Sequence, residues 1–279
     1  RRVNWLQLAR PERDIVIDVP QAFWLALLQG ITEFLPISSS GHLILVPYLL
    51  GWPDQGLMFD VAVHLGALVA VVIYLRQDVV IIARGLVRFI RTGHGSEGSR
   101  LGILIVLATL PVLIAGLWID STIAAMLRQP LVISLTTVVF GVVLLVADRL
   151  GSKQRKISEF GWRDALIIGV AQALALIPGT SRAGITMTAA LIMGGDRSAA
   201  ARFSFLLSIP VILAAGTQQS FELVRAGAEA EVYWPVFVVG VTVAATSAWL
   251  VLKLFMHWIE RAGMLPFVLY RVILGVWIF

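Results

Sequence analysis

Two short polar segments interrupt long apolar stretches of this sequence, and each carries one isolated charge. Glu33 is the only formally charged residue in 19–53, and Arg182 is the only one in 165–195. An ionisable side chain in an apolar membrane segment costs at least about 2.5 kcal/mol, so its presence indicates a function. A carboxylate and a guanidinium with hydroxyl groups beside them are suited to binding and transferring phosphate. Together the two segments therefore predict a phosphate-handling site.

The first polar segment supplies a nucleophile and candidate bases. It reads QGITEFLPISSSGH, from Gln29 to His42. Ser39 and His42 are three residues apart, so their side chains can approach each other on a helical turn. A hydroxyl beside a base is the simplest activated nucleophile, which predicts Ser39 as the nucleophile and either His42 or Glu33 as the base. The alternative for any single serine here is a helix cap.

Glu33 is also a candidate metal ligand. Gln29 lies four residues before it, and on a helix the two side chains share a face. Mg²⁺ usually takes one or two carboxylates together with phosphate oxygens of the substrate. We therefore expect a divalent cation, Mg²⁺ or Ca²⁺, to bind at Glu33 and Gln29 together with a diphosphate. The alternative is a neutral Glu33 in a hydrogen bond between helices.

The second polar segment supplies the anion-binding half of the site. It reads PGTSRAGIT and ends at Thr186, at a point where a helix restarts. Backbone N–H groups at a helix N-terminus bind anions, and Arg182 adds a permanently charged fork for phosphate. The alternative is a structural ion pair between Arg182 and Glu33, although such buried pairs stabilise a protein poorly. The side chains expected to bind substrate are Gln29, Ser38, Ser40, Gly179, Thr180, Ser181, Thr186 and His64.

The elements that must position these residues are those of a membrane protein. Of the 279 residues, 58% are hydrophobic and 14% are charged, and the mean hydropathy is +0.88. A soluble domain has about 25% charged residues. The sequence contains no cysteine, which excludes thiolate catalysis and cysteine-bound metals. The net charge of +5 resides mostly in arginines of short loops, which indicates membrane topology and no nucleic-acid partner.

Six apolar runs are long enough, at roughly 20 residues, to cross a bilayer as helices. The two regions that carry the polar segments, about 21–50 and 162–195, are each broken near a proline, which predicts re-entrant helix–loop–helix segments. We expect the amphipathic segment 78–92 to lie at the membrane interface. The fold class is thus an all-α polytopic membrane protein with about six transmembrane helices and two re-entrant segments. The six runs cover residues 57–75, 101–119, 132–148, 203–220, 235–256 and 264–279.

Basic residues are distributed unevenly among the loops. They concentrate in 76–100 and 149–163, which the positive-inside rule places in the cytoplasm. The loops 120–130 and 221–232 are poor in basic residues and are expected outside. These assignments require each re-entrant segment to return to the side that it entered, the first from outside and the second from the cytoplasm.

Entry from opposite sides implies an inverted repeat. Aligning Pro36 with Pro178 pairs Ser38 with Thr180. Inverted repeats place a binding site at their interface, near the membrane midplane. We therefore predict a single integral membrane domain, 1–279, composed of two pseudo-repeats at about 21–148 and 162–279.

Both polar segments resemble motifs of the undecaprenyl-diphosphatase family, the bacitracin-resistance type of integral membrane phosphatase. Residues 29–33 are similar to the (E/Q)xxxE motif of that family, and residues 178–186 resemble its PGxSRSxxT motif. The resemblance extends from about residue 22 to residue 279. Ala183 stands where the second motif has a serine, so no role of that hydroxyl is carried over.

The resemblance implies hydrolysis of undecaprenyl diphosphate to undecaprenyl phosphate and inorganic phosphate. This reaction recycles the lipid carrier for peptidoglycan synthesis and confers bacitracin resistance. The implied location is the bacterial inner (plasma) membrane, with several crossings and an active site that faces outward. Its partners would be a polyprenyl diphosphate substrate and membrane lipid, and a homodimer is left open. Ser39 would form a phosphoserine with the terminal phosphorus, while Arg182 neutralises the phosphoryl charge.

A polyprenyl-phosphate flippase is the alternative function. Inverted re-entrant repeats around a polar site are also an architecture of transporters, which would use the same arginine and hydroxyls without chemistry. Release of inorganic phosphate by purified protein in detergent distinguishes the two. The sequence has no Walker A motif and no HExxH motif, so ATP hydrolysis and zinc proteolysis have no support.

Overall fold

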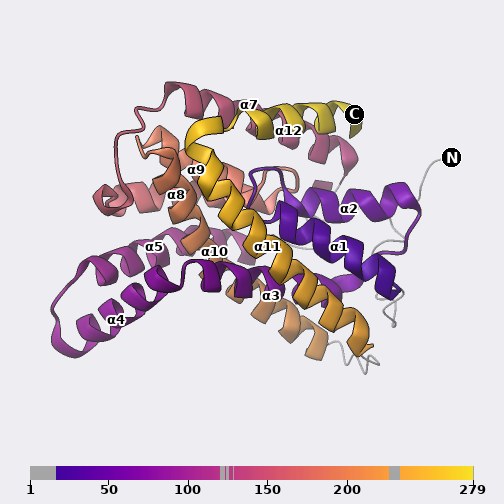
Figure 1. Ribbon diagram of the computed structural model, residues 1–279, viewed down its shortest axis with the longest axis horizontal. Helices are drawn as coiled ribbons and strands as arrows, with labels where there is room; N and C mark the ends of the chain where they lie inside the picture. The colour runs from indigo at the N-terminus through magenta and orange to yellow at the C-terminus, as the bar shows by residue number, and fades with distance from the viewer. Residues whose placement is uncertain (1–16, 120–122, 124–125, 128, 226–232, 279) are drawn as a thin grey trace.

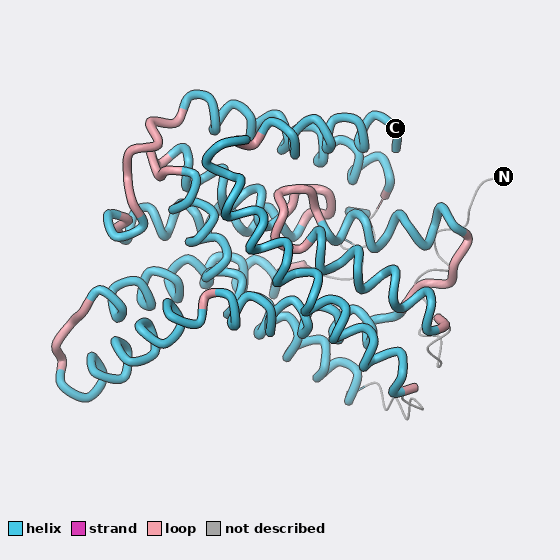
Figure 2. The backbone as a smooth tube through the Cα atoms, viewed as in Figure 1, coloured by secondary structure: helices cyan, strands magenta, loops and turns pink. Residues whose placement is uncertain are grey.

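The computed structural model describes residues 17–119, 123, 126–127, 129–225 and 233–278. Within these ranges the regular secondary structure is helical, apart from a single β-bridge between Arg155 and Gly195. Figure 1 shows the helices packed against one another, and Figure 2 shows that short loops connect them. The all-α architecture is thus confirmed. The two loops expected outside, 120–130 and 221–232, lie partly beyond the described residues.

Five helices in the described ranges are long and apolar enough to cross a bilayer. They coincide with five of the six apolar runs. The sixth run forms α12 (Leu265–Ile278), whose 14 residues give a length of about 21 Å, below the roughly 30 Å of a hydrocarbon core. α12 packs on α7 (Figure 1). The five long helices are α3 (Gly56–Tyr74), α5 (Glu97–Leu117), α7 (Pro130–Leu150), α10 (Arg197–Arg225) and α11 (Trp234–Ala262).

Both polar segments lie at the tips of helical hairpins. The first hairpin is formed by α1 (Val19–Thr32) and α2 (Ser39–Leu50). The second is formed by α8 (Trp162–Ala173), the 3-10 turn η3 (Leu174–Leu176) and α9 (Arg182–Ile192). The longest of these helices has 14 residues, too short to span the hydrocarbon core. The hairpins enter from opposite ends of the molecule, and their connecting loops meet near its middle (Figures 1 and 2).

The first helix of each hairpin packs on a long helix from the other half of the chain. α1 packs on α11, and α8 packs on α5. Likewise, α3 contacts α11 and α10 contacts α5. This exchange of partners is the arrangement that two inverted halves would adopt, while the repeat boundaries at 21–148 and 162–279 stay a prediction. The tips of both hairpins are thereby held between the two halves.

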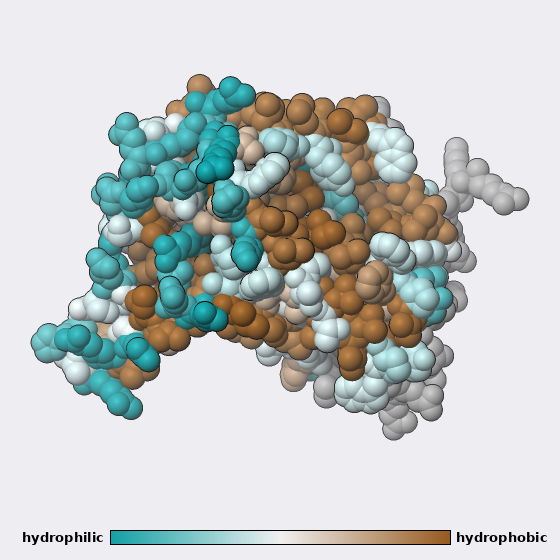
Figure 3. All heavy atoms as spheres, in the orientation of Figure 1, coloured by the Kyte–Doolittle hydropathy of each residue, from teal (hydrophilic) through white to brown (hydrophobic). Residues whose placement is uncertain are grey.

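Charged side chains gather at one end of the molecule. Figure 3 shows a hydrophilic surface on the left and a broad hydrophobic surface over the middle and right. A charged end in water and an apolar band in lipid are what a polytopic protein requires. The ion pairs at this end include Asp148–Arg197 at 2.6 Å, Asp164–Arg155 at 2.7 Å, Asp196–Lys156 at 2.6 Å and Asp78–Arg202.

The amphipathic segment forms α4 (Arg76–Thr92), which pairs with α5 as a projecting helical hairpin (Figure 1). Its apolar side chains are only partly covered by α5, and Ile90 is 80% exposed. The location of α4 at a membrane interface stays a prediction.

Candidate active site

A serine with a left-handed backbone directly precedes the second helix of each hairpin. Ser38 has a φ of 73° directly before α2, and Ser181 has a φ of 70° directly before α9. A positive φ brings Cβ close to the following carbonyl oxygen and costs about 1–2 kcal/mol. The same backbone conformation therefore precedes Ser39 and Arg182, each the first residue of its helix. It pairs Ser38 with Ser181, one residue beyond the pairing with Thr180 that the prolines suggest.

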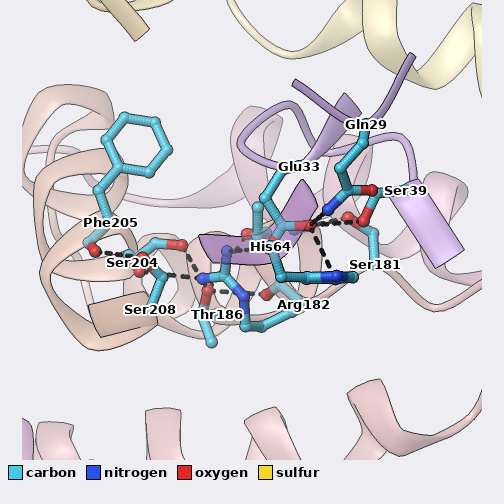
Figure 4. A network of polar contacts seen from close by, with 12 residues as sticks. Gln29, Glu33, Ser39, His64, Ser181, Arg182, Thr186, Ser204, Phe205 and Ser208 are labelled. Atoms are coloured by element: carbon cyan, nitrogen blue, oxygen red, sulfur yellow. Dashed lines mark hydrogen bonds and ion pairs between the residues drawn. The ribbon is translucent and has the colours of Figure 1, made fainter. Parts of the chain in front are cut away.

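Glu33 lies at the centre of the site and connects the two hairpins (Figure 4). Its Oε2 accepts hydrogen bonds from Gln29 Nε2 at 2.9 Å and from Ser39 Oγ at 2.7 Å. Its Oε1 accepts a hydrogen bond from an Arg182 Nη at 3.2 Å. His64 of α3 brings its Nε2 to 3.8 Å from Glu33 Oε2. The Glu33 residue is only 8% exposed, so these partners replace the water that the carboxylate has lost.

The Arg182 guanidinium is held by α10 as well as by Glu33. Its second terminal nitrogen donates to the backbone oxygen of Ser204 at 3.2 Å. Thr186 Oγ1 lies 2.7 Å from Ser204 Oγ and donates to the backbone oxygen of Arg182 at 2.8 Å (Figure 4). Thr186 thus fixes the start of α9 against α10.

A cavity of about 190 Å³ opens beside these groups. Seven of its polar lining residues were expected from the sequence, namely Glu33, Ser38, Ser39, Ser40, His64, Ser181 and Arg182. α10 supplies a largely apolar wall, from Val211, Ile212, Ala215, Gly216 and Gln219. A cavity with a charged part and an apolar wall fits a ligand that combines phosphate with hydrocarbon.

Five further residues expected from the sequence lie near the cavity without lining it, namely Gln29, His42, Gly179, Thr180 and Thr186. Gln29 is fully buried behind Glu33. The backbone at Gly179 is turned toward α7, because Thr137 Oγ1 donates to its carbonyl oxygen at 3.4 Å. These residues support the lining side chains from behind.

His42 is engaged with groups other than Ser39. Its Nδ1 lies 2.6 Å from the backbone oxygen of Ser38, and its Nε2 lies 2.5 Å from the Tyr270 hydroxyl. The two rings also stack, with centroids 5.6 Å apart. The expected pair between Ser39 and His42 is therefore not formed, because the contact with the carbonyl four residues earlier turns the imidazole toward α12. Ser39 donates to Glu33 instead, which leaves Glu33 in the position of a base.

The repeat also aligns Phe59 and His64 with Phe203 and Ser208, which made His64 a candidate, and His64 does line the cavity. Ser208 is fully buried within α10, where its hydroxyl donates to the backbone oxygen of Phe205 at 2.6 Å. His64 Nδ1 lies 2.7 Å from the backbone oxygen of Asp60, so its other ring nitrogen faces Glu33. The repeat alignment therefore does not extend to equivalent side-chain surroundings here.

The protein provides one carboxylate for a metal ion at this site. Over the described ranges, no three His, Cys, Asp or Glu side chains form a group that could hold a metal. Gln29 Oε1 is buried beside Glu33 and has no hydrogen-bond partner. A carboxylate and an unpartnered amide oxygen are suitable ligands for Mg²⁺ or Ca²⁺ when phosphate oxygens and water supply the rest. Glu33 therefore fits a cation that binds in the cavity together with a diphosphate, whereas Gln29 lies behind Glu33 and stays a predicted ligand.

A second buried arginine, which the sequence reasoning overlooked, lies beneath both hairpin tips. Arg271 of α12 has no exposed surface. It donates to the backbone oxygens of Pro36 at 3.2 Å, Gly179 at 2.9 Å and Thr180 at 3.0 Å. Arg271 is the only charged residue in 262–279, so the isolation that identified the other two charges would have identified it as well.

Comparisons with known proteins identify the family of the chain. The model of the family described as bacitracin resistance protein BacA matches residues 22–277. The chain is 54% identical over 252 residues to the undecaprenyl-diphosphatase of Chromohalobacter salexigens, covering 90% of this chain and 94% of that protein. It is 51% identical over 260 residues to the undecaprenyl-diphosphatase of Alcanivorax borkumensis, covering 93% and 97%. It is 50% identical over 252 residues to undecaprenyl-diphosphatase 1 of Pseudoalteromonas translucida, covering 90% and 94%.

Proposed function

Because the chain belongs to the bacitracin resistance protein BacA family, we propose that it hydrolyses undecaprenyl diphosphate to undecaprenyl phosphate and inorganic phosphate. Relatives that match almost the whole chain are named for this reaction. The observation that carries the proposal is the 2.7 Å hydrogen bond from Ser39 Oγ to Glu33, beside Arg182. A flippase needs no nucleophile and leaves this hydrogen bond unexplained, and the names of the relatives do not favour it.

Ser39 is the nucleophile in this mechanism, and Glu33 is its base. Ser39 Oγ forms a bond to the terminal phosphorus as its proton passes to Glu33. The bond from that phosphorus to the bridging oxygen breaks, and undecaprenyl phosphate leaves with the proton that Glu33 returns. Glu33 then takes a proton from water as the water oxygen attacks the phosphoserine. The serine–phosphorus bond breaks, Ser39 regains a proton from Glu33, and inorganic phosphate is released.

Arg182 supplies the positive charge that phosphoryl transfer requires. Charge spreads over the oxygens of the transferred group, and fixed donors aimed at those oxygens lower the barrier. The two hydrogen bonds of Arg182, to Glu33 and to the backbone of Ser204, hold its planar fork beside the cavity. A divalent cation would be held by Glu33 and Gln29 with the diphosphate, where it would add further positive charge against the phosphates.

The apolar wall of the cavity suits the first isoprene units of the substrate. Val211, Ile212 and Ala215 line it from α10, opposite the polar residues of the hairpins. A substrate whose diphosphate lies between the hairpin tips can therefore keep its hydrocarbon against α10 and the surrounding lipid. This division accounts for a binding site that is polar at one side only.

We place the site toward the outer face of the bacterial inner (plasma) membrane. The cavity is lined by residues 211–219 of α10, whereas the ion-paired charged end lies at Arg197, where α10 begins. The positive-inside rule assigns the basic end to the cytoplasm, so the cavity belongs to the other half of the bilayer. A homodimer stays a proposal, which light scattering of the detergent-purified protein tests.

The decisive experiment is a phosphate-release assay with the purified full-length chain in detergent. With undecaprenyl diphosphate and Mg²⁺ or Ca²⁺, we expect inorganic phosphate and undecaprenyl phosphate to appear in equal amounts. Addition of EDTA should lower the rate if a cation is bound with the substrate. Absence of phosphate release from folded protein, together with lipid translocation in vesicles, would favour the flippase instead.

A further inference from the structure

We propose that Arg271 is a positioning residue for this reaction, which holds the tips of both hairpins in register so that Ser39 and Arg182 act on the same phosphoryl group. The inference rests on the proposed function. Arg271 does not line the cavity, so it acts through the backbone of the two tips and not by touching the substrate. No pattern in the two polar segments assigns a role to this residue.

The Arg271 guanidinium donates to backbone carbonyl oxygens from three separate segments. One terminal nitrogen binds Pro36 of the first tip, and the other binds Gly179 and Thr180 of the second tip. Nε donates to the backbone oxygen of Thr137 in α7 at 2.9 Å. Within the described ranges, no carboxylate forms an ion pair with it. A charge buried without a counter-ion is a poor way to stabilise a protein, because apolar residues would fill the space more favourably. The arrangement is therefore better explained by what it does to the two tips.

Two glycines provide the space for this side chain. A Cβ atom at Gly184 would lie 2.9 Å from an Arg271 terminal nitrogen, and one at Gly141 would lie 3.2 Å from Arg271 Cβ. Gly184 belongs to the second polar segment, and its backbone N–H is capped by Ser181 Oγ at 3.1 Å. Close contact with Arg271, and with the Ser181 side chain at 3.2 Å, thus explains a glycine at position 184. α7 and α9 are both shaped around the guanidinium.

The bonds to Arg271 fix the direction of a peptide group at the start of α9. A trans peptide is planar, and its C=O and N–H point in opposite directions. Because the carbonyl of Thr180 points to Arg271, the N–H of Ser181 is turned away from the guanidinium. Ser181 lines the cavity, and backbone N–H groups at a helix start bind anions. On the other tip, the bond to Pro36 holds the turn that leads into Ser38 and Ser39. One side chain therefore orients both halves of the site.

The test compares Arg271→Lys with Arg197→Lys in the full-length, detergent-purified protein. Both substitutions keep the charge and remove the planar fork. Arg197 binds Asp148 at the charged end, away from the cavity, and provides the matched control. We measure kcat and KM for undecaprenyl diphosphate, the affinity for inorganic phosphate by calorimetry, and the melting temperature.

Arg271→Lys should lower kcat/KM about 100-fold, the scale expected for a misplacement of about 1 Å, and should weaken the binding of inorganic phosphate. Arg197→Lys should lower the melting temperature and leave KM and phosphate affinity unchanged. Gly184→Ala, which forces the intact guanidinium to move, should reproduce the Arg271→Lys defect in a milder form.

Wild-type kinetics and phosphate affinity in folded Arg271→Lys would overturn the proposal. If Arg271→Lys lowers only the yield of folded protein, and the folded fraction keeps the wild-type KM and phosphate affinity, the proposal is also overturned. Arg271 would then have only a structural role. If Arg271→Lys does not fold, Gly184→Ala decides, and unchanged kinetics in that variant reject the proposal. If the wild type binds phosphate but releases none from the lipid, the proposed function fails, and phosphate affinity alone then tests Arg271.

Discussion

The two hairpins share one backbone plan and divide the reactive groups between them. In each, a glutamine lies nine residues before the serine with a positive φ: Gln29 before Ser38, and Gln172 before Ser181. Both glutamines are fully buried and leave Oε1 without a hydrogen-bond partner. The position that follows the serine differs, because it carries a hydroxyl in the first hairpin and a guanidinium in the second.

The acidic residue of the site is likewise present in only one of the two hairpins. Glu33 lies five residues before Ser38, and the corresponding position before Ser181 is Leu176, which is apolar. The first hairpin therefore contributes the nucleophile and its base, and the second contributes the anion-binding group. Neither hairpin alone contains a complete site, so catalysis depends on how the two tips are placed against each other. Substitutions in the two hairpins should accordingly fail for different reasons and by different amounts.

Removal of the nucleophile from the first hairpin should have the largest effect. Ser39→Ala deletes the only hydroxyl that donates to Glu33 in the described site, and we expect phosphate release to fall at least about 1,000-fold, as when a nucleophile is removed from other enzymes. The fold should persist, which circular dichroism and the melting temperature check. Ser208→Ala, in the buried part of α10, is the control and should retain most of the activity. Wild-type turnover by Ser39→Ala would remove the covalent step.

Replacement of the guanidinium in the second hairpin should have the next largest effect. Arg182→Lys keeps the charge, but one ammonium group cannot reach both Glu33 and Ser204 while presenting a planar fork to phosphate. We expect kcat/KM to fall about 100-fold, the scale for loss of one charge-stabilising donor. Arg155→Lys, at the base of the same hairpin, is the control. Near-normal kinetics in Arg182→Lys would show that a point charge suffices.

Much of this arrangement is encoded locally and could be predicted from the sequence. Glu33 and Arg182 were identified as isolated charges in apolar runs. Burial of a charge is costly, so such a residue can be recognised from the sequence alone as one with a function. Helix breaks at prolines predicted both hairpins. The partner of His42 could not be predicted, since Tyr270 lies 228 residues away and reaches it only through the packing of α12. Side-chain partners depend on how each helix is rotated about its axis, which periodicity constrains too loosely.

The length of the final helix shows a similar limit. The run 264–279 is apolar enough to predict a transmembrane helix, yet it forms the short helix α12 on α7. Hydropathy reports the solvent that a segment prefers and not the neighbour that it packs against. Arg271, within that same run, donates to carbonyl groups of both tips. A charge in such a run therefore indicates buried polar partners more reliably than the run indicates a full crossing.

Replacement of each left-handed serine by glycine should also have different effects in the two hairpins, but the difference in unfolding free energy should be small. Both substitutions relieve the positive φ, but only Ser181 caps its helix, by accepting a hydrogen bond from Gly184 N at 3.1 Å. The unfolding free energy of Ser38→Gly should therefore exceed that of Ser181→Gly by about 0.3 kcal/mol, because glycine in place of a capping serine costs only a few tenths of a kcal/mol. Thermal unfolding of both variants in detergent measures this difference. The reverse order would mean that the Ser38 hydroxyl stabilises the tip through a contact other than a cap.

Low pH should reveal the smallest difference between the hairpins, which is a difference in stability at the ends that lie away from their tips. Arg155 binds both carboxylate oxygens of Asp164, at 2.9 and 2.7 Å, and these hydrogen bonds hold the pKa of Asp164 below its usual value. A lowered pKa in the folded state contributes stability at pH values above the unfolded pKa of about 3.9, and that stability is lost as the pH falls through the folded pKa. Asp164→Asn should therefore cost at most about 1 kcal/mol at pH 7, with the gap to the wild type closing at acidic pH. Melting temperatures at pH 7 and at pH 3.5 check this. A gap that does not change with pH would assign the effect to packing. A gap that closes would mean that an ion pair stabilises the start of the second hairpin. The first hairpin begins instead with a capping box, in which Asp18 Oδ1 accepts a hydrogen bond from the backbone N–H of Gln21 and Gln21 Oε1 accepts one from the backbone N–H of Asp18.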